Sequence, residues 1–341
     1  MNERKVLVSE VCDGWLHMKR LRTKQSTYAK YSDIVKKHIQ PAIGDLPISE
    51  ISSSKMNEFI YDKLHFGRLD SQGPLSSKTV RDICTILKSI IRYAQSEYHL
   101  NHLASNAVLP KRVRTSLQIL NEDEVKRLEQ YLLSHLGEIR CTGLLLCLYT
   151  GLRLGEICAL KWKDIDLKRE TVHVGHTIQR IPLIGENAEK KTSVILDRPK
   201  SDASQRTIPL PHFITAILKE IYCQAFEDAF FLTNTLKYIE PRNYQYFFKR
   251  VLEKSGVRNV NFHILRHTFA TRCVAAGFDT KSLSEILGHS DTAITLNYYV
   301  HSTLETKRKQ MELVCRDVSL AIFLETGYDK IRVKTSGGAE G

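Results

Sequence analysis

The sequence lacks the features of a membrane-spanning or secreted protein. No run approaches the ~18 to 20 apolar residues that a membrane helix needs, and the start MNERKVLVSE has no apolar signal core. The eight cysteines are scattered without a single C-x-x-C pair, so neither a zinc knuckle nor a disulfide framework is indicated. We expect a cytoplasmic protein without membrane partners, whose thiols are buried and reduced.

The chain also lacks the residue patterns of several enzyme classes. It has no Walker-type glycine loop for nucleotide phosphates and no motif of paired carboxylates. His263 and His267 lie four residues apart, as in zinc proteases, but Ile264 occupies the position where that motif needs a glutamate base. Arg266 beside them would repel a divalent cation. We therefore expect no metal site and no cofactor.

What the chain has in excess is positive charge. Its net charge is +12 and its pI is near 9.2, which favours a polyanionic partner. Residues 1–115 hold 19 basic and 11 acidic residues, whereas the remainder holds 31 and 27. Most of the excess therefore belongs to the first third of the chain.

Helical periodicity covers residues 6–99. The spacing predicts helices around Val6–Leu21, Thr27–Ile39, Lys55–Leu64 and Lys78–Tyr98. The last is amphipathic, and Ser76 or Ser77 can cap its start. A basic helix face is usually only solvated surface. Its four basic residues are candidate DNA contacts: Lys78, Arg81, Lys88 and Arg92.

The periodicity lapses from Asn101 to Ser116, where we place a linker at 106–118. Pro110 is followed by three basic residues that can neutralise phosphates along a DNA backbone, namely Lys111, Arg112 and Arg114. Asn121 then begins N-E-D-E, a polar cap with acidic residues in the first turn of a helix that continues through Leu136.

The second half predicts a mixed domain. An apolar helix over Thr142–Tyr149 precedes three short strands, Thr171–Ile178, Ser193–Leu196 and Arg206–Leu210, which favour a small antiparallel sheet. From Pro211 the chain reads as helical almost to Cys315. The expected fold class is thus mainly α with a small antiparallel β-sheet (α+β).

Four segments carry the candidate chemistry: Thr150–Glu156, Pro199–Pro209, His263–His267, and Leu287–Ser290 followed by Tyr298 and Tyr299. Alone, each is weak evidence, because a helical Arg/Glu pair, a turn lysine or a single histidine is usually structural. Together they describe a cationic pocket around a phosphate, in which guanidinium groups hold the oxygens as negative charge develops. A tyrosine nucleophile would store the bond energy covalently, so rejoining needs no ATP.

In this order the four segments resemble the tyrosine recombinases, or phage integrase family, over about Asn121–Ser302. Residues 6–115 resemble, more weakly, the helical core-binding domain that precedes the catalytic domain in that family. The resemblance implies that two arginines clamp the phosphate, that a hairpin lysine protonates the leaving 5′ oxygen, and that two histidines assist the nucleophile and the phosphate. It further implies that Glu156 orients an arginine or a histidine. The expected catalytic set is Arg153, Lys200, His263, Arg266, His289 and Tyr299.

Two adjacent tyrosines compete for the role of nucleophile, since both lie at family-plausible distances from His289. Neighbours on a helix point about 100° apart, so only one hydroxyl can approach the phosphate in line. The resemblance places a Thr-x-Asn step before the nucleophile and a histidine two residues after it, and only Tyr299 satisfies both. We therefore assign the covalent role to Tyr299 and a packing role to Tyr298.

The resemblance also implies an organisation and partners. A core-binding domain (1–105), a linker (106–118) and a catalytic domain (119–302) would form a clamp around double-stranded DNA recombination sites. Four protomers, a homotetramer, would exchange strands through a Holliday junction, with accessory directionality factors as further partners. Because the helices start near Val6, we expect no separate arm-binding domain. Residues 303–341 are expected to dock on a neighbouring protomer, or on their own domain, and to end in a disordered tail.

Two alternatives stay open at this point. A type IB topoisomerase uses a similar Arg/Lys/His/Tyr set, although the helical N-terminal domain and the Leu-Gly-His-Ser spacing fit a recombinase better. A DNA-binding regulator could keep the fold without catalysis, although all six expected residue types are present. The DNA site, and the choice between integration, excision, inversion and resolution, cannot be read from the sequence.

Overall fold

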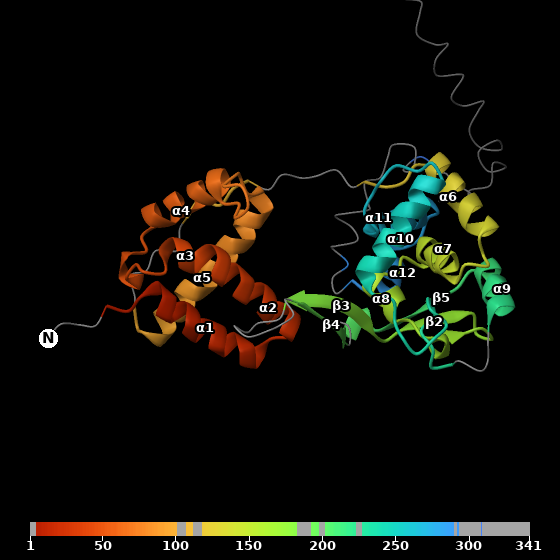
Figure 1. The fold of residues 1–341 in the computed structure, drawn as a ribbon, viewed down its shortest axis with the longest axis horizontal. Coiled ribbons are helices and arrows are strands. Elements are labelled where there is room, and N and C mark those ends of the chain that lie inside the picture. The colour runs from red at the N-terminus through yellow and green to blue at the C-terminus, as the bar shows by residue number, and fades with distance from the viewer. Residues whose placement is uncertain are drawn as a thin grey trace, which may run out of the picture. The chain divides into compact units, whose positions relative to one another are not determined.

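The computed structural model describes residues 5–100, 107–111, 118–182, 192–197, 202–222 and 227–289, together with residues 292 and 308. The chain divides into two compact units (Figure 1), one made of residues 1–116 and 178–197 and the other of residues 117–177 and 198–341. The first unit is mostly helical. The second combines helices with a small sheet, as the sequence predicts for the fold class.

The first unit is built around a helical core. Its helices are α1 (Val8–Arg22), α2 (Gln25–Ile34), the π-helix η1 (Val35–Ile39), α3 (Gln40–Ile43), the 3₁₀ turn η2 (Ile48–Glu50), α4 (Ser53–Phe66) and α5 (Ser77–Glu97). The four predicted helices are thus confirmed, and their ends shift by a few residues. The second of them changes to a π-helix over its last turn.

Helix α5 shows how local sequence fixes an element. Ser76 is its N-cap, and the Ser76 side-chain oxygen accepts from the Thr79 backbone N–H at 3.1 Å. Its buried residues recur at three- and four-residue steps, as the periodicity predicts. They are Val80, Ile83, Cys84, Ile86, Leu87, Ile90, Ile91 and Ala94.

The second unit holds the remaining helices and one three-stranded sheet. Its helices are α6 (Glu122–Ser134), α7 (Ile139–Thr150), α8 (Leu154–Ala159), η3 (Trp162–Asp164), η4 (Asp202–Ser204), α9 (His212–Ile221), α10 (Pro241–Lys254), α11 (His263–Ala275) and α12 (Thr280–Leu287). The sheet order is β1 (Ile165–Asp166), β2 (Thr171–Val174) and β5 (Arg206–Pro209), all antiparallel, with Val174 opposite Arg206. Helix α7 is buried along nearly its whole length and packs against α6 and α11.

The single predicted sheet is wrong in one respect. The chain leaves the first strand at Gly175 and starts a new one, β3 (Thr177–Pro182), which pairs with β4 (Thr192–Asp197) in a separate two-stranded sheet. Glycine contributes no side chain to strand packing, and that favours a break at this point. The β3–β4 pair is therefore an insertion between the neighbouring strands β2 and β5.

The continuous helical stretch predicted after Pro211 is also interrupted. Described residues from 227 to 240 form turns, with Phe230 bridged to Thr235 and Asn234 at φ 53°. Pro241 then occupies the first helical position of α10, where its missing N–H costs nothing. Among the described residues no helix is long and apolar enough to span a membrane.

Candidate active site

Two helices of the second unit end at a glycine, and both glycines serve the candidate site. Helix α7 ends at Gly151 (φ 66°) and α12 at Gly288 (φ 65°), a left-handed conformation that favours glycine. A Cβ at Gly151 would lie 2.6 Å from a Phe269 ring carbon. Glycine is therefore favoured in Thr-Gly-Leu-Arg and Leu-Gly-His because a side chain would be strained or crowded there. The carbonyls of both glycines also accept hydrogen bonds from the site arginines.

Arg266 is the central cation of the site. It lies on α11, is only 2% exposed, and donates from Nη1 to the Gly151 carbonyl at 2.9 Å. Its Nη2 donates to the Leu287 carbonyl at 2.6 Å and lies 2.8 Å from His289 Nε2. One guanidinium therefore ties together the ends of α7 and α12. A buried charge of this kind costs several kcal/mol unless it is hydrogen-bonded, so these carbonyls hold it in place.

Arg153 stands at the start of α8, facing the same turn. Its Nη2 donates to the Gly288 carbonyl at 3.1 Å, and its Nη1 donates to Glu156 Oε1 at 2.7 Å. Glu156 Oε2 accepts from the Arg153 backbone N–H at 2.9 Å, which completes a capping box. A third of the Arg153 side chain is exposed. The expected role of Glu156, to orient an arginine, agrees with these contacts.

Arg206, which the sequence motifs do not single out, also belongs to this network. It is 8% exposed and forms a bidentate ion pair with Glu156, with N–O distances of 3.1 and 2.9 Å. Burial would raise the pKa of Glu156, but the hydrogen bonds and charge of Arg206 and the charge of Arg153 lower it to about 2. The strand pattern held a signal, because Arg206 shares the core-facing side of β5 with Ile208.

The site histidines are neutral near pH 7. Burial and the charges of Arg266, Arg153 and Arg206 lower the pKa of His289 to about 4. Because arginine only donates, His289 Nε2 must accept from Arg266, so the single proton of the neutral ring is on Nδ1. Partial withdrawal of the ring from water, with His267 and Arg266 nearby, lowers the pKa of His263 to about 4.

The arrangement is suited to an anion. Arg153 and Arg206 pair with one carboxylate, Glu156, whereas Arg266 donates to main-chain carbonyls, which leaves an excess of positive charge. The rings of His263 and His267 meet edge to face, with centroids 4.6 Å apart. Within the described residues no group of three or more His, Cys, Asp or Glu is placed to hold a metal ion.

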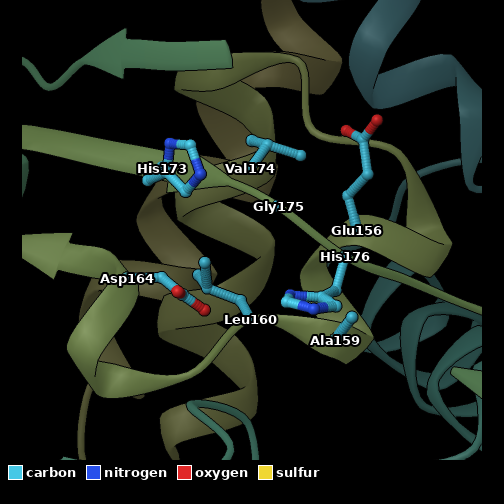
Figure 2. Close-up of a pocket in the computed structure, with 8 residues that line it drawn as sticks. All are labelled: Glu156, Ala159, Leu160, Asp164, His173, Val174, Gly175 and His176. Carbon is cyan, nitrogen blue, oxygen red and sulfur yellow. The ribbon is translucent and has the colours of Figure 1, made fainter. Parts of the chain in front are cut away.

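Behind Glu156 lies a narrow pocket, lined also by Ala159, Leu160, Asp164 and residues 173–176 (Figure 2). Figure 2 shows the Glu156 carboxylate pointing away from the other labelled side chains. The pocket has no room for the centre of a water molecule. The Glu156 carboxylate therefore interacts with Arg153 and Arg206 and not with the pocket.

Two of the expected catalytic residues, Lys200 and Tyr299, lie outside the described residues, as do Tyr298, Arg112 and Arg114. The structure brings together the other four members of the expected set, Arg153, His263, Arg266 and His289. Arg153, Arg266 and His289 are joined through hydrogen bonds to each other or to shared turns. His263 lies one helical turn from Arg266 on α11 and feels its charge.

Comparison with known proteins decides the family. The phage integrase family model matches residues 118–306, more than half of the chain, and the phage integrase N-terminal SAM-like domain matches residues 7–64. The chain belongs to the phage integrase family. It is therefore a tyrosine recombinase, an enzyme that cleaves and rejoins DNA.

Integrase relatives resemble the chain over most or part of its length. A XerC-like tyrosine recombinase of Caldanaerobacter subterraneus is 30% identical, over 90% of this chain and 82% of the relative. The transposase of transposon Tn916 from Enterococcus faecalis is 28% identical, over 50% of this chain and 44% of the relative. The Tn1549 transposon integrase in complex with transposon right end DNA has the same fold, with a TM-score of 0.72 at 21% identity, covering 91% of this chain and 100% of that chain.

The predicted DNA contacts in the first unit of this integrase differ in how exposed their side chains are. Lys78, Arg92 and Lys111 are exposed, and Lys88 is half-buried. Arg81 instead donates from Nη1 to the Pro110 carbonyl at 2.5 Å. Arg81 therefore anchors the main chain near the predicted linker.

The second unit carries a basic surface on α10 that the sequence motifs do not indicate. On α10, Arg242, Tyr246 and Lys249 recur at four- and three-residue steps on the side opposite the buried residues, and all three are exposed. Arg242 Nε donates to the Tyr246 hydroxyl at 3.0 Å and the guanidinium lies over the Tyr246 ring. Cations beside an exposed aromatic ring are typical of surfaces that bind nucleic acid.

Proposed function

We propose that this integrase recombines specific DNA sites through a 3′-phosphotyrosyl intermediate on Tyr299, and that four protomers exchange strands through a Holliday junction. The observation that carries the proposal is the preassembled cationic site, in which Arg153, Arg266 and His289 are held around the turns at Gly151 and Gly288. Donors fixed before substrate arrives stabilise developing charge without reorganising.

Each expected catalytic residue has a role in the proposed reaction. The two arginines hold the non-bridging phosphate oxygens, and the Nδ1–H of neutral His289 donates to one of them. The Tyr299 oxygen attacks phosphorus, and His263, which its lowered pKa keeps neutral near pH 7, accepts the tyrosine proton. The bond from phosphorus to the 5′ oxygen breaks, and Lys200 supplies the proton that this leaving oxygen needs. Rejoining reverses these transfers.

Assembly on DNA is the second part of the proposal. The lambda integrase tetramer bound to a Holliday junction shares the fold, with a TM-score of 0.59 at 20% identity, over 87% of this chain and 78% of that chain. This likeness supports a homotetramer on paired sites, with residues 303–341 as the candidate contact between protomers and directionality factors as further partners. Those residues, except Arg308, lie outside the described part of the chain.

We expect cleavage to proceed in excess EDTA and without nucleotide. The guanidinium groups of Arg153 and Arg266 perform the charge stabilisation that other nucleases assign to Mg²⁺. The measurement is the yield of covalent protein–DNA complex on a nicked duplex that carries the recombination site, with and without EDTA. Recovery of the complex only when Mg²⁺ is restored would refute this prediction.

We expect Lys249→Ala and Arg92→Ala each to weaken binding to duplex DNA of any sequence. Each removes a phosphate-neutralising charge, so the slope of log K against log salt should fall by about one unit per variant. The measurement is a fluorescence anisotropy titration at four salt concentrations.

The matched control is Lys163→Ala. Lys163 is also exposed, but Asp228 pairs with it at 2.7 Å. If all three variants change the slope equally, the effect reflects net charge alone and the proposed contact surfaces are wrong.

A further inference from the structure

Arg206 occupies a position in β5 that normally holds an apolar side chain. Residues along β5 alternate between buried and exposed, and Arg206 shares the buried side with Ile208. An arginine is stable there only if its donors are satisfied. Its contacts therefore show what the buried charge holds in place.

Those contacts reach two separate elements. Nη1 and Nη2 form the bidentate ion pair with Glu156 on α8, and Nη1 also donates to the Ser204 carbonyl at 3.1 Å. Nε donates to the Ile286 carbonyl near the end of α12 at 2.5 Å. A Cβ added to Gly288 would lie 3.0 Å from Arg206 Cδ, so this turn packs directly on the arginine stem.

Both elements hold Arg153. Glu156 accepts from its Nη1 and from its backbone N–H, and the Gly288 carbonyl accepts from its Nη2. His289 follows Gly288 directly. Arg206 thus contacts Glu156 and the Gly288 turn, which together hold Arg153. The same turn carries His289.

We propose that Arg206 is a positioning residue that sets Arg153 and the Gly288–His289 turn in their phosphate-binding geometry without touching DNA itself. The proposal rests on the proposed function, in which Arg153 and His289 bind the scissile phosphate. A displacement of about 1 Å in a catalytic group can cost about 10²-fold in rate. Loss of Arg206 should therefore slow cleavage much more than it weakens DNA binding.

The ionisation of Glu156 gives a second readout. The groups facing its carboxylate are Arg206 from β5, Arg153 beside it, His263 from α11 and Cys147 from α7. Only the ionised carboxylate can hold both arginines, so activity requires a pH above its pKa. In wild-type protein the Glu156 pKa lies below those of His263 and His289, so the histidines set the acid limb. Without Arg206, burial should raise this pKa, and the acid limb of the cleavage profile should move to higher pH.

The test compares single-turnover cleavage by wild type, Arg206→Gln, Arg206→Lys, Glu156→Gln and the double variant Arg206→Gln/Glu156→Gln. Arg206→Gln should lose about 10²-fold in rate with an acid limb shifted upward. Arg206→Lys keeps the charge without the fork and should fall in between. The double variant leaves no buried carboxylate without its partner, so it should lack the shifted limb and lose less rate than the two single variants predict together.

Arg258→Gln is the matched control. Arg258 also pairs with a buried carboxylate, Glu124, at 2.8 Å and donates to a main-chain carbonyl, but away from the site. It should change thermal stability without moving the pH profile. If Arg206→Gln behaves like this control, or cleaves at the wild-type rate, the positioning role is overturned.

Deuterium exchange separates this proposal from the proposed function. In Arg206→Gln, exchange should rise in peptides covering Arg153 and Gly288–His289 more than in the rest of the unit, whether or not the protein cleaves DNA. A uniform rise, or none, would overturn the positioning role. Absence of any covalent complex from wild-type protein would instead overturn the proposed function.

Discussion

Replacing Tyr299 with phenylalanine is expected to leave DNA binding intact and to abolish the covalent protein–DNA complex. The substitution removes only the hydroxyl oxygen that would bond to phosphorus, so no other group can take its place in line with the leaving oxygen. The measurement uses a suicide substrate that carries the recombination site and is nicked beside the cleavage point. Wild-type protein should yield a 3′-phosphotyrosyl peptide modified at Tyr299.

Tyr298→Phe is the matched control for this experiment. It carries the same chemical change one residue earlier, about 100° away on the helix expected from the sequence, and should still trap the DNA. A covalent complex from Tyr299→Phe and none from Tyr298→Phe would reverse the assignment of the nucleophile. Loss of the complex in both variants would show that the pair acts together and that the choice between them was misplaced.

Replacing Lys200 with alanine is expected to slow cleavage by about 10²- to 10⁴-fold, the usual contribution of general acid catalysis. The rate should recover on DNA whose scissile 5′ oxygen is replaced by sulfur, because a thiolate leaves without a proton. The role requires neighbouring cations, since they make it easier for an ammonium group to release its proton. The measurement is the single-turnover rate on both substrates.

Lys191→Ala provides the comparison, because Lys191 lies in the same inserted stretch between β2 and β5. It should cleave both substrates at close to the wild-type rate. Equal damage by Lys200→Ala on the oxygen and sulfur substrates would mean that Lys200 binds or positions the DNA and is not the acid.

Local elements were predictable from sequence because their signals act over a few residues. Ser76 and Asn121 cap α5 and α6 through bonds to residues three positions ahead, and the apolar spacing of α5 marks its buried face directly. The four ordered motifs identified the family for a similar reason. The residue types and spacing of each motif are visible in the sequence, without knowledge of the tertiary structure.

Partners of buried charges were not predictable in the same way. Arg81 reads as one more cation on a basic helix face, yet it anchors the Pro110 carbonyl 29 positions away. The strand break at Gly175 likewise depends on strand pairing. The sequence predicts one sheet, but β2 pairs with β5, and the β3–β4 pair inserted between them forms a second sheet. Alternation predicts a strand but does not name its neighbour.

The residue types of the site were therefore fixed by the sequence, and their assembly by tertiary structure. Arg153, His263, Arg266 and His289 are recognisable from their motifs. Their geometry depends on bonds between distant positions, such as Arg266 to Gly151 over 115 residues and Arg206 to Glu156 over 50. A buried guanidinium must satisfy its donors wherever the packed chain offers acceptors, and only the folded core determines which carbonyls and carboxylates those are.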